Sequence, residues 1–329
     1  MDHFQRIRAA MNGDACDRIP VALWRHFPGD DQDPRLLAAH MVDWQRRWDF
    51  DLLKFMPSGT YGVEDWGAKT AYRGAPNGAR EVVDPAIRQV GDWSLKPLDV
   101  SSGSYGRQNE ALAIAARELG NSVPILQTVF SPLTTARKLA GDRLLADMRR
   151  HPDALREALD TITDTTIRFA LDAVAAGAHG VFLATQLASH RVMTEAEYAS
   201  FGRPYDLRVL RAVQGAGRLH MLHAHGIDLM LELLTDYPVQ MLNWHDRLTE
   251  PGLREAGKGF PGLLAGGLDE GATLLGAGTE ATRREVHDAI AQTGGRRLLV
   301  APGCVLRIDT PAEQIKAVLQ AVESPPSLS

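Results

Sequence analysis

Two histidines separated by one residue are the sharpest chemical signal in this sequence. His223 and His225 lie in the segment 219–226, where side chains two positions apart on an extended chain point to the same face. Together with Cys304 they would offer two imidazoles and one thiolate, a ligand set typical of a catalytic zinc site with one open position. The residues alone leave an alternative, in which both histidines are hydrogen-bonding pocket residues and Cys304 is a small buried apolar side chain.

Other polar side chains with chemical potential follow short apolar runs. His245 and Asp246 stand side by side, and Lys54 lies within the apolar run 52–56, where removal from water would lower its pKa. We interpret these three residues as candidate catalytic groups for proton transfer or substrate orientation. The alternatives are a surface histidine beside a helix-capping aspartate, and a lysine that extends out between helices.

A further set of polar residues is predicted to contact the substrate. Arg25 and His26 could bind an anionic group, because a guanidinium matches carboxylate and phosphate geometry, although a surface salt bridge is the alternative. The candidate substrate-binding residues are Arg25, His26, Gln127, Gln186, Asn243 and Asp269.

Eight short apolar runs are expected to position these side chains. Each is continuous rather than alternating in polarity, which is typical of strands buried on both faces. The predicted strands are 19–24, 50–55, 123–129, 180–184, 219–223, 239–243, 263–266 and 298–301. Helical patterns separate most of them, at 136–150, 152–176, 194–213, 226–236, 280–293 and 311–322.

This alternation predicts an α/β fold, a single (β/α)8 TIM barrel that spans residues 1–329 as one domain. Active sites of such barrels lie at the C-terminal ends of the strands, so the polar residues above should converge there, with Cys304 near the two histidines. The segment 56–121 is rich in Gly, Pro, Asp and Ser. It is interpreted as an insertion after strand 2 that includes a small hairpin and helical character near 108–119, and it is expected to act as a lid over the barrel mouth.

Composition excludes several other classes of protein. The 329 residues carry a formal net charge of −5 without a basic stripe, which argues against a nucleic-acid binder. No apolar run reaches the length that spans a bilayer, and the first residues lack the apolar core of a signal peptide. With only two cysteines, these features favour a cytoplasmic protein in a reducing compartment, and the tail 323–329 is expected to be a frayed end.

Motifs spread along the chain resemble the uroporphyrinogen decarboxylase superfamily, which also contains zinc-dependent, often cobalamin-linked, methyltransferases. The resemblance covers about 18–322 and rests on the order of several stretches. These are 18–21 (R-x-P-V), 123–141 (strand 3 and the loop after it), 198–205 (a helix ending in P-Y), 264–269 and 304–311.

The decarboxylase branch differs from this chain at three places. Those enzymes carry R-Q-A-G-R-Y after strand 1, whereas the segment 24–28 has a single arginine. They carry an essential Asp in F-S-D-I after strand 2, and the segment 55–58 has none. Their G-H-G at the end of strand 8 is replaced here by 302–304, Pro-Gly-Cys. All three differences argue against decarboxylation of a tetrapyrrole.

The methyltransferase branch binds zinc through H-x-C and a distant Cys. The resemblance implies that His223, His225 and Cys304 hold the metal here, with His225 in place of the first Cys. The resulting site would be more Lewis-acidic and would favour activation of water or an alkoxide over a thiol.

The expected function is therefore a zinc-dependent methyl- or alkyl-transferase that acts on a small molecule. A corrinoid or tetrahydrofolate would be carried by a separate partner protein, because no corrinoid-binding domain is recognised in the chain. A metal-free decarboxylase of a small carboxylated substrate is the first alternative. A non-catalytic small-molecule or corrinoid-binding module is the second.

Overall fold

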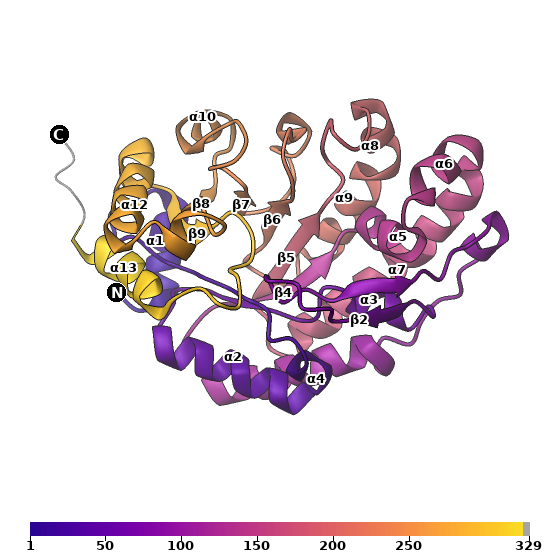
Figure 1. Cartoon of the computed structure of the whole chain (residues 1–329), viewed down its shortest axis with the longest axis horizontal. Coiled ribbons are helices and arrows are strands. Elements are labelled where there is room, and N and C mark those ends of the chain that lie inside the picture. The colour runs from indigo at the N-terminus through magenta and orange to yellow at the C-terminus, as the bar shows by residue number, and fades with distance from the viewer. Residues whose placement is uncertain (325–329) are drawn as a thin grey trace.

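The computed structural model describes residues 1–324, so 325–329 of the predicted frayed tail lie outside the described residues. A parallel sheet curls through the middle of the molecule, and helices cover its outer side (Figure 1). Within the described residues, its seven strands are hydrogen-bonded in chain order. They are β1 (Leu53–Phe55), β4 (Ile125–Phe130), β5 (Gly180–Thr185), β6 (Met221–Ala224), β7 (Met241–Trp244), β8 (Leu263–Leu268) and β9 (Leu298–Pro302). The predicted α/β class with parallel strand pairs is confirmed.

The first predicted strand, 19–24, is the exception: it does not form a regular strand, so the predicted eight-stranded barrel is not confirmed. Within residues 1–324 this segment forms only single parallel bridges, Val21 with Val300 and Arg25 with Leu306. The Ala22 N–H still donates to the Val300 carbonyl at 3.0 Å, and the Asp51 N–H donates to the Val21 carbonyl at 2.8 Å. The segment therefore lies between β9 and the chain just before β1. Pro20 lacks an N–H, so it cannot donate to a regular ladder.

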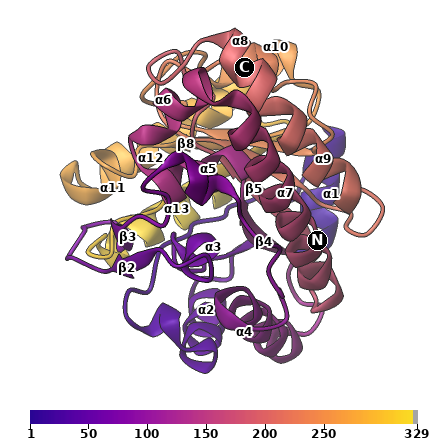
Figure 2. The same cartoon turned by 90° about the vertical axis from the view of Figure 1, so that its right-hand side faces the viewer.

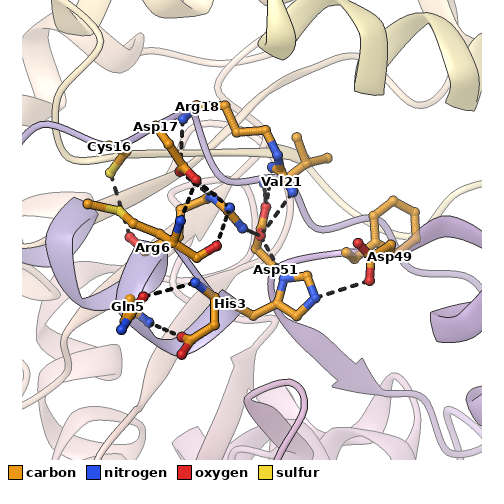
Figure 3. A network of polar contacts seen from close by, with 12 residues as sticks. His3, Gln5, Arg6, Cys16, Asp17, Arg18, Val21, Asp49 and Asp51 are labelled. Atoms are coloured by element: carbon orange, nitrogen blue, oxygen red, sulfur yellow. Dashed lines mark hydrogen bonds and ion pairs between the residues drawn. The ribbon is translucent and has the colours of Figure 1, made fainter.

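A buried carboxylate fastens this irregular segment (Figure 3). Asp51 is fully buried and accepts from the Val21 N–H at 2.8 Å, from Arg6 Nη1 at 2.6 Å and from Arg18 Nη1 at 2.6 Å. His3 Nδ1 lies 2.9 Å from the same carboxylate. Asp51 thus joins helix α1 (His3–Asn12), the segment 18–21 and the chain that enters β1.

The helices predicted from the sequence pattern have different outcomes in the structure. Three predicted helices are confirmed, as α7 (Pro152–Ala175), α12 (Thr279–Thr293) and α13 (Ala312–Glu323). Two others are each divided in two, at Gly141 and at Gly202, because glycine is the weakest helix former apart from proline. The resulting pairs are α5 (Pro132–Ala140) with α6 (Arg143–Arg150), and α8 (Glu195–Phe201) with α9 (Arg203–Val213).

The predicted helix 226–236 is wrong, because the structure has only a 3₁₀ turn, η3 (Leu231–Leu233), within that segment. Gly226 and Asp228 have φ values of 108° and 54°, so the backbone that leaves β6 is not in the right-handed helical region. Of α2 (Pro34–Trp48), the sequence indicated only an amphipathic helix face at 44–48. The helices that were not predicted are α1, α3 (Tyr61–Glu64), α10 (Leu253–Gly259) and α11 (Thr273–Gly276).

The segment 56–121 has two parts with different places in the fold. Its predicted hairpin is present, as antiparallel β2 (Lys69–Ala71) and β3 (Glu81–Asp84). After the 3₁₀ turn η2 (Val90–Trp93), helix α4 (Gly103–Leu119) begins five residues earlier than predicted. It lies beside α2 in the outer helical layer and also contacts α7 (Figure 2). The second half of the segment is therefore part of that layer, and only the first half approaches the strand ends.

Within residues 1–324, no helix combines the length and the apolar character needed to cross a bilayer.

Candidate functional site

Four candidate metal ligands meet at the C-terminal ends of the strands. They are His223, His225, His245 and Cys304, and their ligand atoms all lie within 4.8 Å of one another. The His225 Nδ1 lies 3.3 Å from the His245 Nε2 and 3.6 Å from the Cys304 Sγ. Tetrahedral zinc with Zn–N near ~2.1 Å and Zn–S near ~2.3 Å requires ligand separations of roughly 3–4 Å, so the cluster needs little contraction to hold an ion.

Strand register explains why these residues meet. His223 pairs in register with Asn243 across β6 and β7, so the residues two positions further on, His225 and His245, leave neighbouring strands together. Cys304 follows β9 in a loop whose Gly303 lies against His245. A side chain at Gly303 would place its Cβ 2.9 Å from the His245 Cα, so only glycine permits this close approach.

A neighbouring amide fixes the tautomer of His223. The Asn243 Nδ2 donates to the carbonyls of Ala265 at 2.8 Å and Pro302 at 3.0 Å. Because both amide hydrogens are used, the Asn243 Oδ1 must accept from the His223 Nδ1, 2.6 Å away. The Nε2 of His223 is then left with its lone pair for a metal. Asn243, which the sequence suggested as a substrate contact, instead orients a candidate ligand.

We expect that Asn243→Ala will lower zinc affinity by about 10- to 100-fold, the usual effect of losing a group that orients a metal-binding histidine. Competition with a chromophoric chelator measures this affinity. Asn12→Ala, at the end of α1, is the matched control and should leave the affinity unchanged. An Asn243→Ala protein that folds normally and binds zinc as tightly as the parent would contradict the assigned orientation.

A carboxylate lies behind His245. Glu270 Oε1 is 3.5 Å from the His245 Nδ1, on the side away from the cluster. Burial raises the pKa of Glu270 above its usual value. Glu270 was not predicted from the sequence, although its place in the loop directly after β8 is the signal that could have identified it.

Two of the candidate ligand histidines, His223 and His225, are held neutral. Burial, followed by the charges of His225 and Lys54, lowers the pKa of His223 well below 6.5. Burial and the charge of Lys138 also lower the pKa of His225. Neutral imidazoles keep the lone pairs that a metal requires, so the site does not need to lose protons from these two residues at neutral pH.

Three members of the cluster, His223, His225 and Cys304, line a cavity of about 500 Å³. Lys54, His26 and Gln186 line this cavity, as the sequence suggested. The Lys54 side chain is 6% exposed, and its ammonium lies 3.9 Å from the centroid of the Phe182 ring. Burial lowers the pKa of Lys54 to about 7. The cavity is also lined by Arg80 and by Lys138, neither of which was predicted, and burial lowers the pKa of Lys138 to about 7.

Two predicted substrate contacts do not line the cavity. The Arg25 guanidinium donates to the Ile308 carbonyl at 3.0 Å and stacks on Phe27, with 5.2 Å to the ring centroid. Gln127 is fully buried within β4, and its amide donates to the Thr128 carbonyl at 3.1 Å. Both side chains therefore contribute to packing and to local hydrogen bonding at their observed positions.

Two predicted carboxylates are engaged with the backbone outside the cavity. Asp246 accepts from the Gly267 N–H at 3.0 and 3.1 Å with its two oxygens, and burial raises its pKa to about 6. Asp269 accepts from the N–H groups of Gly271 and Ala272 at 2.8 and 2.9 Å. The first joins the ends of β7 and β8, and the second shapes the turn after β8.

The fold and this site define an α/β protein with a His/Cys cluster and a small-molecule cavity at the ends of its parallel strands. A family model described as uroporphyrinogen decarboxylase (URO-D) matches residues 2–325. The chain belongs to the uroporphyrinogen decarboxylase family.

Curated relatives include two kinds of enzyme. Methylcobamide:CoM methyltransferase MtaA of Methanosarcina barkeri is 26% identical over 214 residues, which cover 64% of this chain and 61% of that protein. The match thus spans about three fifths of that relative's length. Uroporphyrinogen decarboxylase of Rhodococcus opacus is 27% identical over 264 residues, covering 75% of this chain and 71% of that protein.

Among solved structures, a methyltransferase from Methanosarcina mazei superposes with a TM-score of 0.86 at 22% identity and covers 98% of both chains. At that identity the likeness shows a shared fold.

Proposed function

We propose that this chain is a zinc-dependent methyl- or alkyl-transferase that acts on a small molecule. The observation that carries the proposal is the cluster of His223, His225, His245 and Cys304, whose ligand atoms lie within 4.8 Å of one another. Imidazole and thiolate are the ligands that zinc prefers, and the cluster faces a cavity of small-molecule size. The methyltransferase relatives support this choice of reaction class.

Bound zinc would act as a Lewis acid that stabilises the anionic form of the acceptor's nucleophilic atom. The residues of the chain then have distinct tasks. Asn243 and Glu270 orient His223 and His245, and Asp246 holds the backbone that carries His245. Lys54, His26 and Gln186 line the space where the acceptor would lie.

The proposal includes the architecture and the partner. The segment 19–24 would complete a barrel between β9 and β1, which places all strand ends around one mouth. The hairpin β2–β3 would serve as the lid. A corrinoid or tetrahydrofolate on a separate protein would supply the alkyl group.

Metal content and methyl transfer together test the proposal. Purified protein is analysed for metals, stripped with a chelator and reloaded with zinc, and assayed for methylation of small thiols and alcohols with methylcobalamin as the donor. We expect one zinc per chain and activity that is lost and recovered with the metal. Protein that neither binds zinc nor transfers a methyl group would overturn the proposal and favour a non-catalytic binding module.

Decarboxylase relatives at similar identity make decarboxylation of a small carboxylated substrate the second candidate. We expect, however, that the pure protein will not convert uroporphyrinogen to coproporphyrinogen. The segment 55–58 carries no Asp. Arg25, the one arginine in the segment 24–28, donates to the Ile308 carbonyl and does not line the cavity. Chromatography of the porphyrin products, with an authentic decarboxylase as the positive control, measures this. Sustained formation of coproporphyrinogen would reverse our preference between the two reactions.

A further inference from the structure

A second cavity lies at the end of the sheet opposite to the His/Cys cluster. Its volume is about 810 Å³, which is within the range of small-molecule sites. Part of its lining comes from the segments 174–179 and 216–219, which lead into the N-terminal ends of β5 and β6. Among the described residues, none lines both this cavity and the one beside the cluster.

One face of α1 forms an apolar wall of the second cavity. Its lining side chains are three and four residues apart, the spacing of neighbours on one helix face. They are Phe4, Ile7, Arg8 and Met11. Val174 and Leu219 add further apolar surface to the lining. Arg6 is not part of this wall, because its guanidinium donates to Asp51 instead (Figure 3).

Two arginines at the second cavity carry uncompensated positive charge. Arg8, on α1, and Arg218, just before β6, both line the cavity and are exposed. Within residues 1–324, neither guanidinium lies within ion-pair distance of a carboxylate. The apolar side chains of the wall are buried or half-buried, so the two charges stand nearer to solvent, at the opening of an apolar cavity.

Two histidines present hydrogen-bond donors at the same end of the sheet. Each uses its Nδ1 to accept a backbone N–H, His179 from Ile125 at 3.1 Å and His220 from Val181 at 3.3 Å. Burial lowers the pKa of both imidazoles, so they are neutral near pH 7. A neutral imidazole that accepts with Nδ1 carries its hydrogen on Nε2. His179 lines the cavity, so its Nε2–H is a donor available to a ligand.

The donor of His220 is buried and unpartnered. The side chain is 1% exposed, and its Nε2 has no hydrogen-bond partner among the described residues. The Gly217 carbonyl acts to raise the pKa of the ring, but it does not meet the geometry of a hydrogen bond. Gly217 lines the cavity, and a Cβ there would lie 2.9 Å from the His220 Cε1, the atom bonded to Nε2. Buried polar groups are normally hydrogen-bonded, so an unpaired donor this close to a cavity needs an explanation.

We infer that the second cavity binds a small molecule that has an apolar body and one oxyanion head group. Guanidinium and imidazole N–H groups match the acceptor oxygens of a carboxylate or a phosphate, so Arg8, Arg218 and His179 would hold the head group. The apolar body would lie against the wall formed by α1. In α/β barrels the chemistry takes place at the other end of the strands, so this ligand is distinct from the substrate of the proposed transferase.

Calorimetric titration of the full chain with four probes tests this site. The probes are octanoate, octyl phosphate, 1-octanol and inorganic phosphate. We expect at least one octyl anion to bind about tenfold more tightly than 1-octanol, because a hydrogen bond to a charged group is worth roughly one such step. The more tightly bound anion identifies the head group, and inorganic phosphate, which lacks the apolar body, should bind more weakly than both. Equal binding of the three octyl compounds, or binding of none, would overturn the inference.

Substitutions locate the bound anion. Arg8→Gln and Arg218→Gln should each weaken the preferred anion about tenfold and leave 1-octanol unchanged. Both side chains are exposed, so these variants should fold as the parent does. Arg35→Gln, at an exposed position of α2, is the matched control and should bind as the parent. Lys54→Met should also bind as the parent. Binding that Lys54→Met abolishes and the two arginine variants retain would place the anion beside the His/Cys cluster and contradict the inference.

The ring nitrogens of the histidines give a direct readout of position. In protein labelled with ¹⁵N at histidine, the preferred anion should shift the Nε2 signals of His179 and His220, which are assigned with His179→Gln and His220→Gln. The signals of His40, on α2, should stay unchanged. A shift of His225 without a shift of His179 would contradict the inference. Neither experiment requires zinc or methyl transfer, so failure of the second site and failure of the proposed function are separate results.

Discussion

Cys304→Ser is expected to lower the zinc affinity of this protein by more than about 100-fold, beyond the 10- to 100-fold that follows loss of an orienting group. Cys304 contributes the one sulfur in the cluster, 3.6 Å from the His225 Nδ1. Serine keeps the size of the side chain but offers a hydroxyl, which is a poorer zinc ligand than a thiolate. Chelator competition measures the affinity, and elemental analysis of purified protein measures the metal retained.

Cys16→Ser is the matched control, because it removes the other cysteine of the chain. Cys16 lies near α1, where its sulfur is 3.7 Å from the Arg6 carbonyl. We expect it to leave zinc content unchanged. If the two substitutions have equal and small effects on zinc, Cys304 is a packing residue and the transferase proposal loses its main support.

Asp51→Ala is expected to destabilise the protein by about 3–5 kcal/mol, because it removes one partner of a buried charge network and leaves the others uncompensated. Arg6 and Arg18 each donate to this carboxylate at 2.6 Å, and the Val21 N–H depends on it for its hydrogen bond. The loss should be measured as the change in the free energy of unfolding by urea.

Asp49→Ala provides the comparison within the same network. The Asp49 side chain is 80% exposed, and its ion-pair partner within the described residues is His3, at 3.1 Å, so its loss should cost less than about 1 kcal/mol. If Asp51→Ala lowers the free energy of unfolding no more than Asp49→Ala does, the buried network does not fasten the segment 19–24.

The Asp51 carboxylate also makes the stability of the protein depend on pH. Burial alone would raise the pKa of Asp51, but the hydrogen bonds from His3 and Arg18 outweigh burial, and the pKa is lowered. A lowered folded-state pKa contributes stability above the unfolded value of about 3.9, and this contribution is lost as the pH falls through the folded value. The parent should therefore lose stability in acid more steeply than Asp51→Asn, and parallel curves would contradict this role.

Most of the strands and the helices α7, α12 and α13 could be predicted because their signals are local. A short continuous apolar run predicts a buried strand wherever it occurs, and α7, α12 and α13 each carry a full helical pattern. The segment 19–24 has the same apolar run, yet its pairing depends on β9 and Asp51, which are distant in sequence. The predicted helix 226–236 is absent because Gly226 and Asp228 have positive φ values, which lie outside the right-handed helical region.

The candidate site also contains residues that the sequence indicated and contacts that depend on the fold. His223, His225 and Cys304 were proposed as ligands from residue type, spacing and resemblance, and the structure brings their ligand atoms together. His245 was interpreted as a catalytic group, and its place in the cluster follows from the register between β6 and β7. Asp246 and Asp269 stand at strand ends as expected, but the N–H groups they bind belong to backbone that only the fold brings near.

The order of the residues is enough to predict the α/β class, the family and the residue types available for a metal site, because periodicity and motifs are properties of neighbouring residues. Which side chains share a cavity can be learned only from the folded chain. In the fold, the Arg25 guanidinium donates to the Ile308 carbonyl and the Asn243 amide contacts His223. Lys138, on α5, lines the same cavity as Lys54. The physical reason is that these outcomes depend on strand register and loop direction, which are set by hydrogen bonds and packing between segments far apart in the chain.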